Sequence, residues 1–315
     1  MRSTADSYRA RAEASRGRAR LAPIFVTVLV LLVAGASCRR RDGGGSDGRR
    51  VIIQNKGSDT LLSVAQAWAE AYGVVNASVA VAVTGGGSGT GISSLLNGTV
   101  DIANSSRTIS EKEREEAVKR GVEPKELVVG FDALAVFVHP ANPLKVVSLG
   151  QLAGIYGEGG TIVRWSQLGA QVPGCPSDEI ILVSRQNNSG TYTYFAEAVL
   201  KKNDFKLGSR DMHGSKDVVD LVAHTPCAVG YSGLAYNVPE VAMLCVSKED
   251  GGPCVPPTLE NARNQSYPIA RPLFMYTNGE PKAETKAYLD WIMGDAGQCV
   301  IYEKGYAPAT QVTCK

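Results

Sequence analysis

Arg185 and the Ser189-Gly190-Thr191 tripeptide have residue types and a spacing that could bind an anion. They lie in a polar segment between an apolar run at 180–183 and a predicted helix at 192–202. The free amides of a first helical turn attract anions, and glycine allows close approach to the backbone. Arginine adds a planar pair of donors that suits oxyanions. The segment therefore predicts an anion site, although an ordinary helix cap beside a surface arginine has the same sequence.

Two further segments repeat the order of apolar strand, Gly/Ser/Thr loop and helix. They are residues 57–60, between a strand at 51–53 and a helix at 61–72, and residues 84–91, between a strand at 79–83 and a helix that begins at 92. The glycine-rich loop has neither the lysine of a P-loop nor the frame of a nucleophile elbow. Three such loops at the carboxyl ends of parallel strands indicate a ligand site of an α/β fold.

The elements that must position these loops alternate along the chain, which predicts the α/β class. Further strands are expected at 127–130, 133–138 and 269–276, and further helices at 111–120, 149–156, 215–223 and 284–293. The Pro-rich break at 139–143 reads as a hinge into a second lobe, and 248–268 reads as a loop.

The 315 residues allow one large or two ordinary domains, and 44% apolar with 20% charged residues is typical of a globular protein. Residues 1–37 contain six arginines and two acidic residues, which leaves 27 basic and 29 acidic residues in 38–315. A nucleic-acid partner is not expected, because it would require a basic face.

The N-terminus has the charge and hydropathy pattern of an export signal. Three arginines at 16–20 precede the apolar run 21–36, and small residues then lead to Cys38. This ending resembles a bacterial lipobox, in which the cysteine is lipid-modified, except that Gly35 replaces an aliphatic residue. A secretory signal without lipid and an uncleaved anchor remain alternatives. Residues 1–38 are thus predicted to be the signal, and 39–50 a flexible polar tether.

Six cysteines remain when Cys38 is set aside for lipid, and an even number permits disulfides in an exported protein. Sequence alone does not fix the pairing. Proximity favours two of the pairs, and elimination leaves the third: Cys245–Cys254, Cys299–Cys314 and Cys175–Cys227. No zinc site is predicted, because no pair has CxxC spacing and the chain has three histidines.

An enzyme is a poorer explanation of the same loops. A hydrolase would use Ser88 or Ser189 as nucleophile, but neither lies in an elbow. A histidine base would come from His139, His213 or His224, none of which stands in a recognisable motif. We therefore expect binding without catalysis, and no cofactor or metal.

Several separated motifs in the same order resemble the phosphate-binding proteins of bacterial phosphate ABC importers (PstS-type), over roughly 51–315. They are Gly57-Ser58-Asp59-Thr60, the run Gly86–Gly91, Asn104-Ser105-Ser106-Arg107, Arg185 with Ser189-Gly190-Thr191, the run Gly230–Tyr236, the run Tyr276–Pro281, Gly297-Gln298 and Gly305-Tyr306-Ala307-Pro308.

The resemblance implies an extracytoplasmic receptor of the type II periplasmic-binding-protein fold that captures inorganic phosphate and delivers it to the importer's membrane permease. Each of its two α/β lobes holds a mostly parallel sheet flanked by helices, and two strands form the hinge. Lobe 1 would comprise 51–135 and 269–315, lobe 2 would comprise 136–268, and a monomer is expected. The implied phosphate-binding candidates are Ser58, Asp59, Thr60, Leu61, Ser88, Gly89, Thr90, Ser106, Arg107, Arg185, Ser189, Gly190 and Thr191.

One departure bears on selectivity. Many members have an aspartate in the third loop that accepts the proton of hydrogen phosphate, and Ser106 stands there in this chain. Asp59 could take that role from the first loop. A carboxylate accepts a proton from phosphate but meets sulfate as an unpaired charge. A same-fold receptor for sulfate or molybdate, and a phosphate sensor without transport, remain the alternatives.

Overall fold

The computed structural model describes residues 50–314. In its first part, strands β1 (Val51–Gly57), β2 (Val79–Thr84) and β3 (Ile102–Ser105) are parallel, with β1 between the other two. Helices α1 (Leu62–Val75) and α2 (Ser88–Leu96) connect them, and α3 (Glu111–Lys119) follows β3. The carboxyl ends of these strands therefore lie at one edge of the sheet, where the predicted loops begin.

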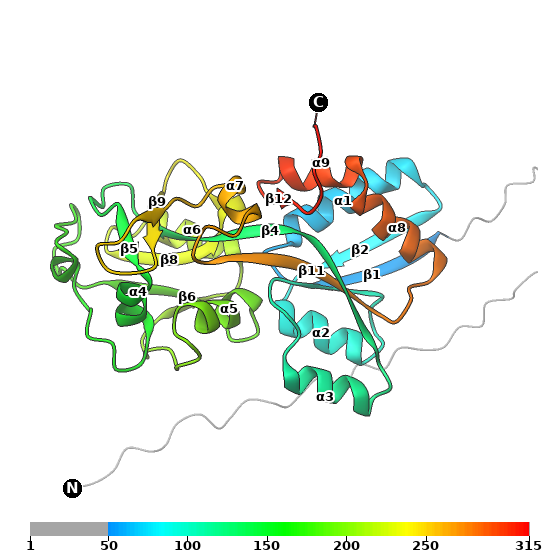
Figure 1. The fold of residues 1–315 in the computed structure, drawn as a ribbon, viewed down its shortest axis with the longest axis horizontal. Helices are drawn as coiled ribbons and strands as arrows, with labels where there is room; N and C mark the ends of the chain where they lie inside the picture. The colour runs from blue at the N-terminus through cyan, green and yellow to red at the C-terminus, as the bar shows by residue number, and fades with distance from the viewer. Residues whose placement is uncertain (1–49, 315) are drawn as a thin grey trace, which may run out of the picture. The chain divides into compact units, whose positions relative to one another are not determined.

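Two long strands connect the first sheet to the second (Figure 1). Strand β4 (Pro124–Val138) pairs with β11 (Ala270–Asn278) up to Ala133, and then with β8 (Ala228–Gly233) from Leu134 onward. The sequence predicts two strands here, at 127–130 and 133–138. The structure has one, with a register irregularity against β11 that falls between Val128 and Gly130.

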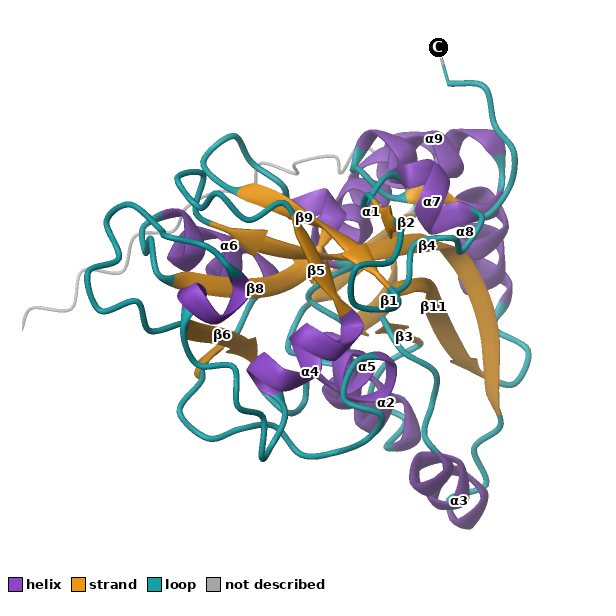
Figure 2. Ribbon diagram, turned by 60° about the vertical axis from the view of Figure 1, so that its left-hand side comes forward, coloured by secondary structure: helices purple, strands orange, loops and turns teal. Residues whose placement is uncertain are grey.

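The second part is built around β8, which pairs in parallel with β6 (Ile181–Arg185), as β6 does with β7 (Arg210–Met212). The other strands are β5 (Val146–Ser148), β9 (Ala242–Ser247) and β10 (Cys254–Val255). Strand β9 pairs with β4, and β5 and β10 each pair with β9. The helical segments of this part are α4 (Leu149–Tyr156), η1 (Trp165–Leu168), α5 (Gly190–Ala198), α6 (Ser215–Ala223), η2 (Leu234–Tyr236) and α7 (Leu259–Arg263). Figure 2 shows α4, α5 and α6 beside strands β5, β6 and β8.

The chain then returns through β11 to the first part. Helices α8 (Ala283–Met293) and α9 (Asp295–Glu303) follow, and β12 (Ala307–Pro308) pairs with β4. One apolar core packs α1 and α8 against β1, around Trp68, Tyr288 and Ile292. A second, separate core of the other sheet surrounds Trp165, Phe195 and Tyr231. Two further apolar clusters, around Phe274 and around Val218, cover the other faces of the two sheets, so β4 and β11 connect two separately packed lobes.

Helix boundaries near the site differ from the sequence expectation for local reasons. Helix α5 begins two residues earlier than expected because Ser189 caps it, and its hydroxyl accepts from the Thr191 N–H at 3.2 Å. The helix ends early because Lys201 and Lys202 adopt positive φ angles that no α-helix allows. Helix α2 begins at Ser88 within the glycine-rich run, directly after Gly87 at φ +89°.

The segment 248–268, expected to be a loop, contains β10 and α7. Thr258 caps α7 by accepting a hydrogen bond from the Asn261 N–H at 3.1 Å. Ala262, within this short helix, is fully buried. The proline- and glycine-rich composition around this cap obscures its signal.

Candidate functional site

Three serines from three loops of the first lobe meet at the sheet edge. The Ser58 hydroxyl, after β1, donates to Ser106 Oγ, after β3, at 2.9 Å. The Ser106 N–H donates to the hydroxyl oxygen of Ser88, the first residue of α2, at 3.0 Å. All three side chains are buried. Such hydroxyls can reorient to donate to an anion, because each carries one rotatable proton.

The amino end of α5 brings the second lobe against these serines. A Cβ atom added to Gly190 would lie 2.1 Å from Ser88 Oγ and 2.7 Å from Ser106 Oγ, so only glycine fits. The next residue, Thr191, lies with its hydroxyl oxygen 3.0 Å from that of Thr60 in the first lobe. The expected anion-attracting helix terminus of α5 therefore faces the serine cluster directly.

Arg185, at the end of β6, is buried and extends to the first lobe. Its Nη2 donates to Asp59 Oδ2 at 3.0 Å and to the His213 carbonyl at 2.8 Å, while Nη1 donates to Ser215 Oγ at 2.9 Å. Asp59 Oδ1 accepts from the Gly86 N–H at 2.8 Å. Burial lowers the pKa of Arg185, and the negative charge of Asp59 opposes that effect.

Asn188 makes a second contact between the lobes. Its carbonyl accepts from the Gly89 N–H at 3.1 Å, and its side chain donates to the Gly86 carbonyl at 3.0 Å. The same side chain lies 3.5 Å from the Thr90 hydroxyl. Gly87 leaves room for Asn188, because a Cβ there would lie 2.5 Å from the Asn188 carbonyl oxygen. Gly89 and Thr90 are thus at the lobe boundary, as expected of site residues.

The main chain of the first loop is fixed by its own turn and by tyrosines. The Leu61 N–H donates to the Ser58 carbonyl at 3.1 Å, and the Leu61 side chain is fully buried in the lobe core. The Tyr236 hydroxyl donates to the Asp59 carbonyl at 2.6 Å, and the Tyr306 hydroxyl donates to the Thr60 carbonyl. These contacts hold the loop rigidly at the sheet edge.

Arg107 has a different set of partners from the other predicted site residues. Its two terminal nitrogens donate to the Glu113 carboxylate, each at 2.7 Å, and Nη1 also donates to the Thr108 carbonyl. Burial raises the pKa of Glu113, but the hydrogen bonds and charge of Arg107 outweigh it and hold that pKa below its usual value. The two terminal nitrogens are thereby engaged at the start of α3, whereas the buried Nε has no hydrogen-bond partner within residues 50–314.

Sequence reasoning missed a second buried ion pair beside the serines. Arg271 in β11 and Asp132 in β4 are both fully buried, with Nη2 and Oδ2 at 2.8 Å. Arg271 also donates to the Ser106 carbonyl and to the Thr60 hydroxyl oxygen, both at 3.3 Å. The sequence did carry a signal for this pair. Arg271 is the one charged residue of the predicted strand at 269–276, and a charge that is buried in a strand requires a partner.

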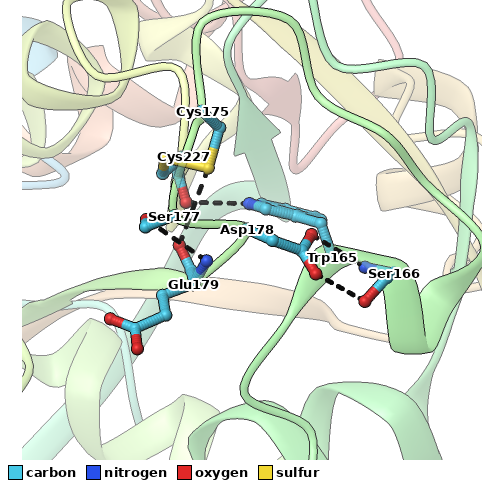
Figure 3. The surroundings of a disulfide bond; sticks show 7 residues. All are labelled: Trp165, Ser166, Cys175, Ser177, Asp178, Glu179 and Cys227. Carbon is cyan, nitrogen blue, oxygen red and sulfur yellow. Dashed lines mark hydrogen bonds between the residues drawn. A yellow bond between two sulfur atoms is a disulfide. The ribbon is translucent and has the colours of Figure 1, made fainter.

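The six cysteines of the described region form three disulfides: Cys175–Cys227, Cys245–Cys254 and Cys299–Cys314. These are the pairs that proximity and elimination predict. Figure 3 shows the first disulfide beside Trp165, whose indole N–H donates to the Cys227 carbonyl at 3.0 Å. In the neighbouring turn, the Asp178 carboxylate accepts a hydrogen bond from the Ser166 N–H. This disulfide is in the second lobe's core, away from the serine cluster.

Cys38, the predicted signal at 1–38 and all but the last residue of the tether lie outside the described residues. Within 50–314, no helix is both long enough and apolar enough to cross a membrane. In the same range, His, Cys, Asp and Glu side chains form no cluster of three that could hold a metal ion. The site's chemistry is accordingly argued from hydroxyls, backbone amides and arginines.

Comparison with known proteins identifies the family. The PBP superfamily domain matches residues 42–296. The chain is 31% identical over 267 residues to the phosphate-binding protein PstS of Pseudomonas aeruginosa, which covers 81% of this chain and 82% of that protein. This chain belongs to the PstS-type family of the PBP superfamily.

Two solved structures of this superfamily extend the match to the fold. A substrate-binding protein of Clostridium perfringens, solved with bound phosphate, has a TM-score of 0.72 at 27% identity and covers 82% of this chain and 100% of its own. An ABC-type phosphate transport receptor of Vibrio cholerae has a TM-score of 0.65 at 28% identity, with 81% and 99% covered. The two-lobed α/β fold expected from the sequence is therefore confirmed.

Proposed function

We propose that this protein is an extracytoplasmic receptor that captures inorganic phosphate between its lobes and delivers it to an ABC importer. The observation that carries the proposal is the convergence of buried donors from both lobes. Serines of three first-lobe loops meet the capped amino end of α5 and the guanidinium of Arg185. The family consists of transport receptors, so binding without chemical conversion is expected.

The charges at the site favour an anion held by hydrogen bonds. Arg185 pairs with Asp59 and Arg271 pairs with Asp132, so these four residues have no net formal charge. A phosphate dianion is then stabilised by reoriented hydroxyls, by backbone amides and by the partial positive charge of helix termini. The loops already hold these donor atoms in place, so little free energy is lost in ordering them when the anion exchanges its water shell for the site.

All thirteen residues predicted from the sequence belong to the proposal, with two roles among them. We place the hydroxyls, the glycines, Asp59 and Arg185 in contact with the anion, whereas Leu61 and Arg107 shape the loops that hold it. Arg107 takes this role because the carboxylate that it binds, Glu113, lies six residues along its own chain, whereas Arg185 binds Asp59 across the two lobes. Closure of the two lobes on the anion would bury it completely and stabilise the closed state.

Asp59 is proposed to accept the proton of hydrogen phosphate. Its two oxygens accept one bond each, from Gly86 and from Arg185. A carboxylate offers about four acceptor positions, so capacity for a protonated ligand remains. Ser106, which stands where many relatives have an aspartate, donates or accepts through a neutral hydroxyl and supplies no charge.

The parts outside the ligand site follow the same proposal. Residues 1–38 would direct export, with Cys38 as the lipid-modified residue and 39–50 as the tether. Lobe 1 would comprise 51–135 with 269–315, and lobe 2 would comprise 136–268. The monomeric receptor would present both lobes to the membrane permease.

Thermal unfolding with added anions tests the proposed ligand. A ligand that binds only the folded state stabilises it by about 4 kcal/mol at a concentration 1,000 times its Kd. We expect phosphate to raise Tm by several degrees, and sulfate at equal ionic strength to leave it unchanged. An equal shift with sulfate would indicate a receptor for another oxyanion, and no shift with phosphate would refute the proposal.

A further inference from the structure

The buried pair Arg271–Asp132 joins the two strands that connect the lobes. The two residues are direct cross-strand neighbours in the antiparallel pairing of β11 with β4, which run side by side in Figure 1. Nε and Nη2 of Arg271 donate to Asp132 Oδ2 at 3.1 and 2.8 Å. Asp132 Oδ1 accepts from the Leu234 N–H of the second lobe at 3.1 Å.

The remaining donors of Arg271 are directed at the site loops. Nη1 donates to the Ser106 carbonyl after β3, and Nη2 donates to the Thr60 hydroxyl oxygen after β1, each at 3.3 Å. The guanidinium carbon lies 5.6 Å from the centre of the Tyr194 ring on α5. Arg271 is therefore fixed on several sides by packing and hydrogen bonds, as a residue that orients others must be.

The bond from Arg271 restricts the direction of the Thr60 proton, because a guanidinium has no acceptor to which Thr60 could donate. A hydroxyl has a single proton, so when its oxygen accepts from Arg271 the proton is free to point elsewhere. The partner on the other side is the Thr191 hydroxyl at 3.0 Å, at the start of α5. A chain of bonds thus runs from Asp132 through Arg271 and Thr60 to the second lobe.

We propose that Arg271 is a positioning residue that makes Thr60 a dedicated donor to the bound anion. Asp132 holds the guanidinium in the plane this requires, and its carboxylate cancels the charge of Arg271. The inference rests on the proposed phosphate-binding function and adds a residue to it. Lysine cannot replace Arg271, because a single ammonium nitrogen cannot stand at the three positions of Nε, Nη1 and Nη2, which together bind Asp132, the Ser106 carbonyl and Thr60.

A double-mutant cycle tests the inference in the purified protein, with phosphate affinity measured by calorimetry. Thr60→Val removes the hydroxyl and keeps the shape of the side chain, and Arg271→Lys keeps the charge and removes the fork. We expect each single variant to weaken phosphate binding about tenfold or more. In the Thr60→Val background, Arg271→Lys should weaken binding by less than about twofold, because the group it orients is gone.

A structural role for Arg271 would give a different result. Arg271→Lys would then lower affinity by the same factor with or without the Thr60 hydroxyl, and that outcome would overturn the inference. Arg107→Lys provides the matched control, since Arg107 is also buried and paired with a carboxylate but makes no contact with Thr60. Its effect, whatever its size, should be additive with Thr60→Val.

Two further measurements keep the test decisive. If Arg271→Lys does not fold, the double variant Arg271→Met/Asp132→Leu removes both buried charges, which proteins often tolerate, and should show the same dependence on Thr60. Failure of the proposed function is distinguishable, because the unmodified protein would then bind no phosphate. Phosphate binding by the unmodified protein with an additive cycle would overturn only the role of Arg271.

Discussion

Arg185 and Arg107 come from comparable regions, each following a buried strand next to serines, yet the fold gives them different partners. Arg185 crosses to the other lobe and pairs with Asp59, whereas Arg107 turns to Glu113 six residues along its own chain. The two ion pairs therefore lie in different places, one within the short segment 107–113 and one between the lobes. Arg185 can therefore link lobe closure to the anion, and Arg107 stabilises the loop that carries Ser106.

The largest expected effect separates these two arginines. Arg185→Lys removes the fork that spans Asp59, Ser215 and the loop carbonyls, and we expect phosphate affinity to fall about 100-fold, together with a lower Tm. Arg107→Lys should also lower Tm, but affinity should change by about threefold or less. Calorimetry and thermal unfolding of both variants measure the contrast. Equal losses of affinity would break the distinction.

A smaller effect is expected on ligand preference. Asp59→Asn keeps the shape of the side chain and removes the charge that accepts the phosphate proton, so the ratio of phosphate to sulfate affinity should fall about tenfold. Competition titrations with both anions give the ratio. Asp101→Asn is the matched control, because Asp101 accepts from the Gln54 N–H in the same lobe, and should leave the ratio unchanged. An unchanged ratio for Asp59→Asn would exclude Asp59 as the selectivity residue.

The smallest effect concerns the Arg107–Glu113 pair and pH. The pKa of Glu113 is lowered in the folded protein, so its charge stabilises the fold above the ordinary glutamate pKa of 4.5, and this stabilisation is lost as pH falls through the lowered value. Glu113→Gln should lower Tm by about 2–4 °C at pH 7, and this difference should shrink steadily as pH is lowered below 4.5. A difference in Tm that stays constant with pH would show that charge is not its cause.

The loops could be predicted from sequence because their signals are local. Ser189-Gly190-Thr191 carries a cap, a close-approach glycine and a hydroxyl within three residues, and the structure places all three as expected. The disulfides were predictable for a related reason, since two of the three pairs are close in sequence. In each case the partners lie within a short stretch of chain.

The ion pairs could not be predicted in the same way. Arg271 and Asp132 are 139 residues apart, and only the pairing of β11 with β4 brings them together. The Arg107 partner was within reach, because Ser110 and Glu113 have the spacing of a capping box, which the structure forms. Partners far apart in sequence meet only when particular strands pair, and the residue pattern of one segment does not say with which strand it will pair.

Calorimetric titration of the purified protein, dialysed free of phosphate, tests the central claim most directly. Phosphate and sulfate are titrated separately at the same pH and ionic strength. The account predicts tight binding of one phosphate per chain and no heat from sulfate. Tight sulfate binding, or no binding of either anion, would contradict it.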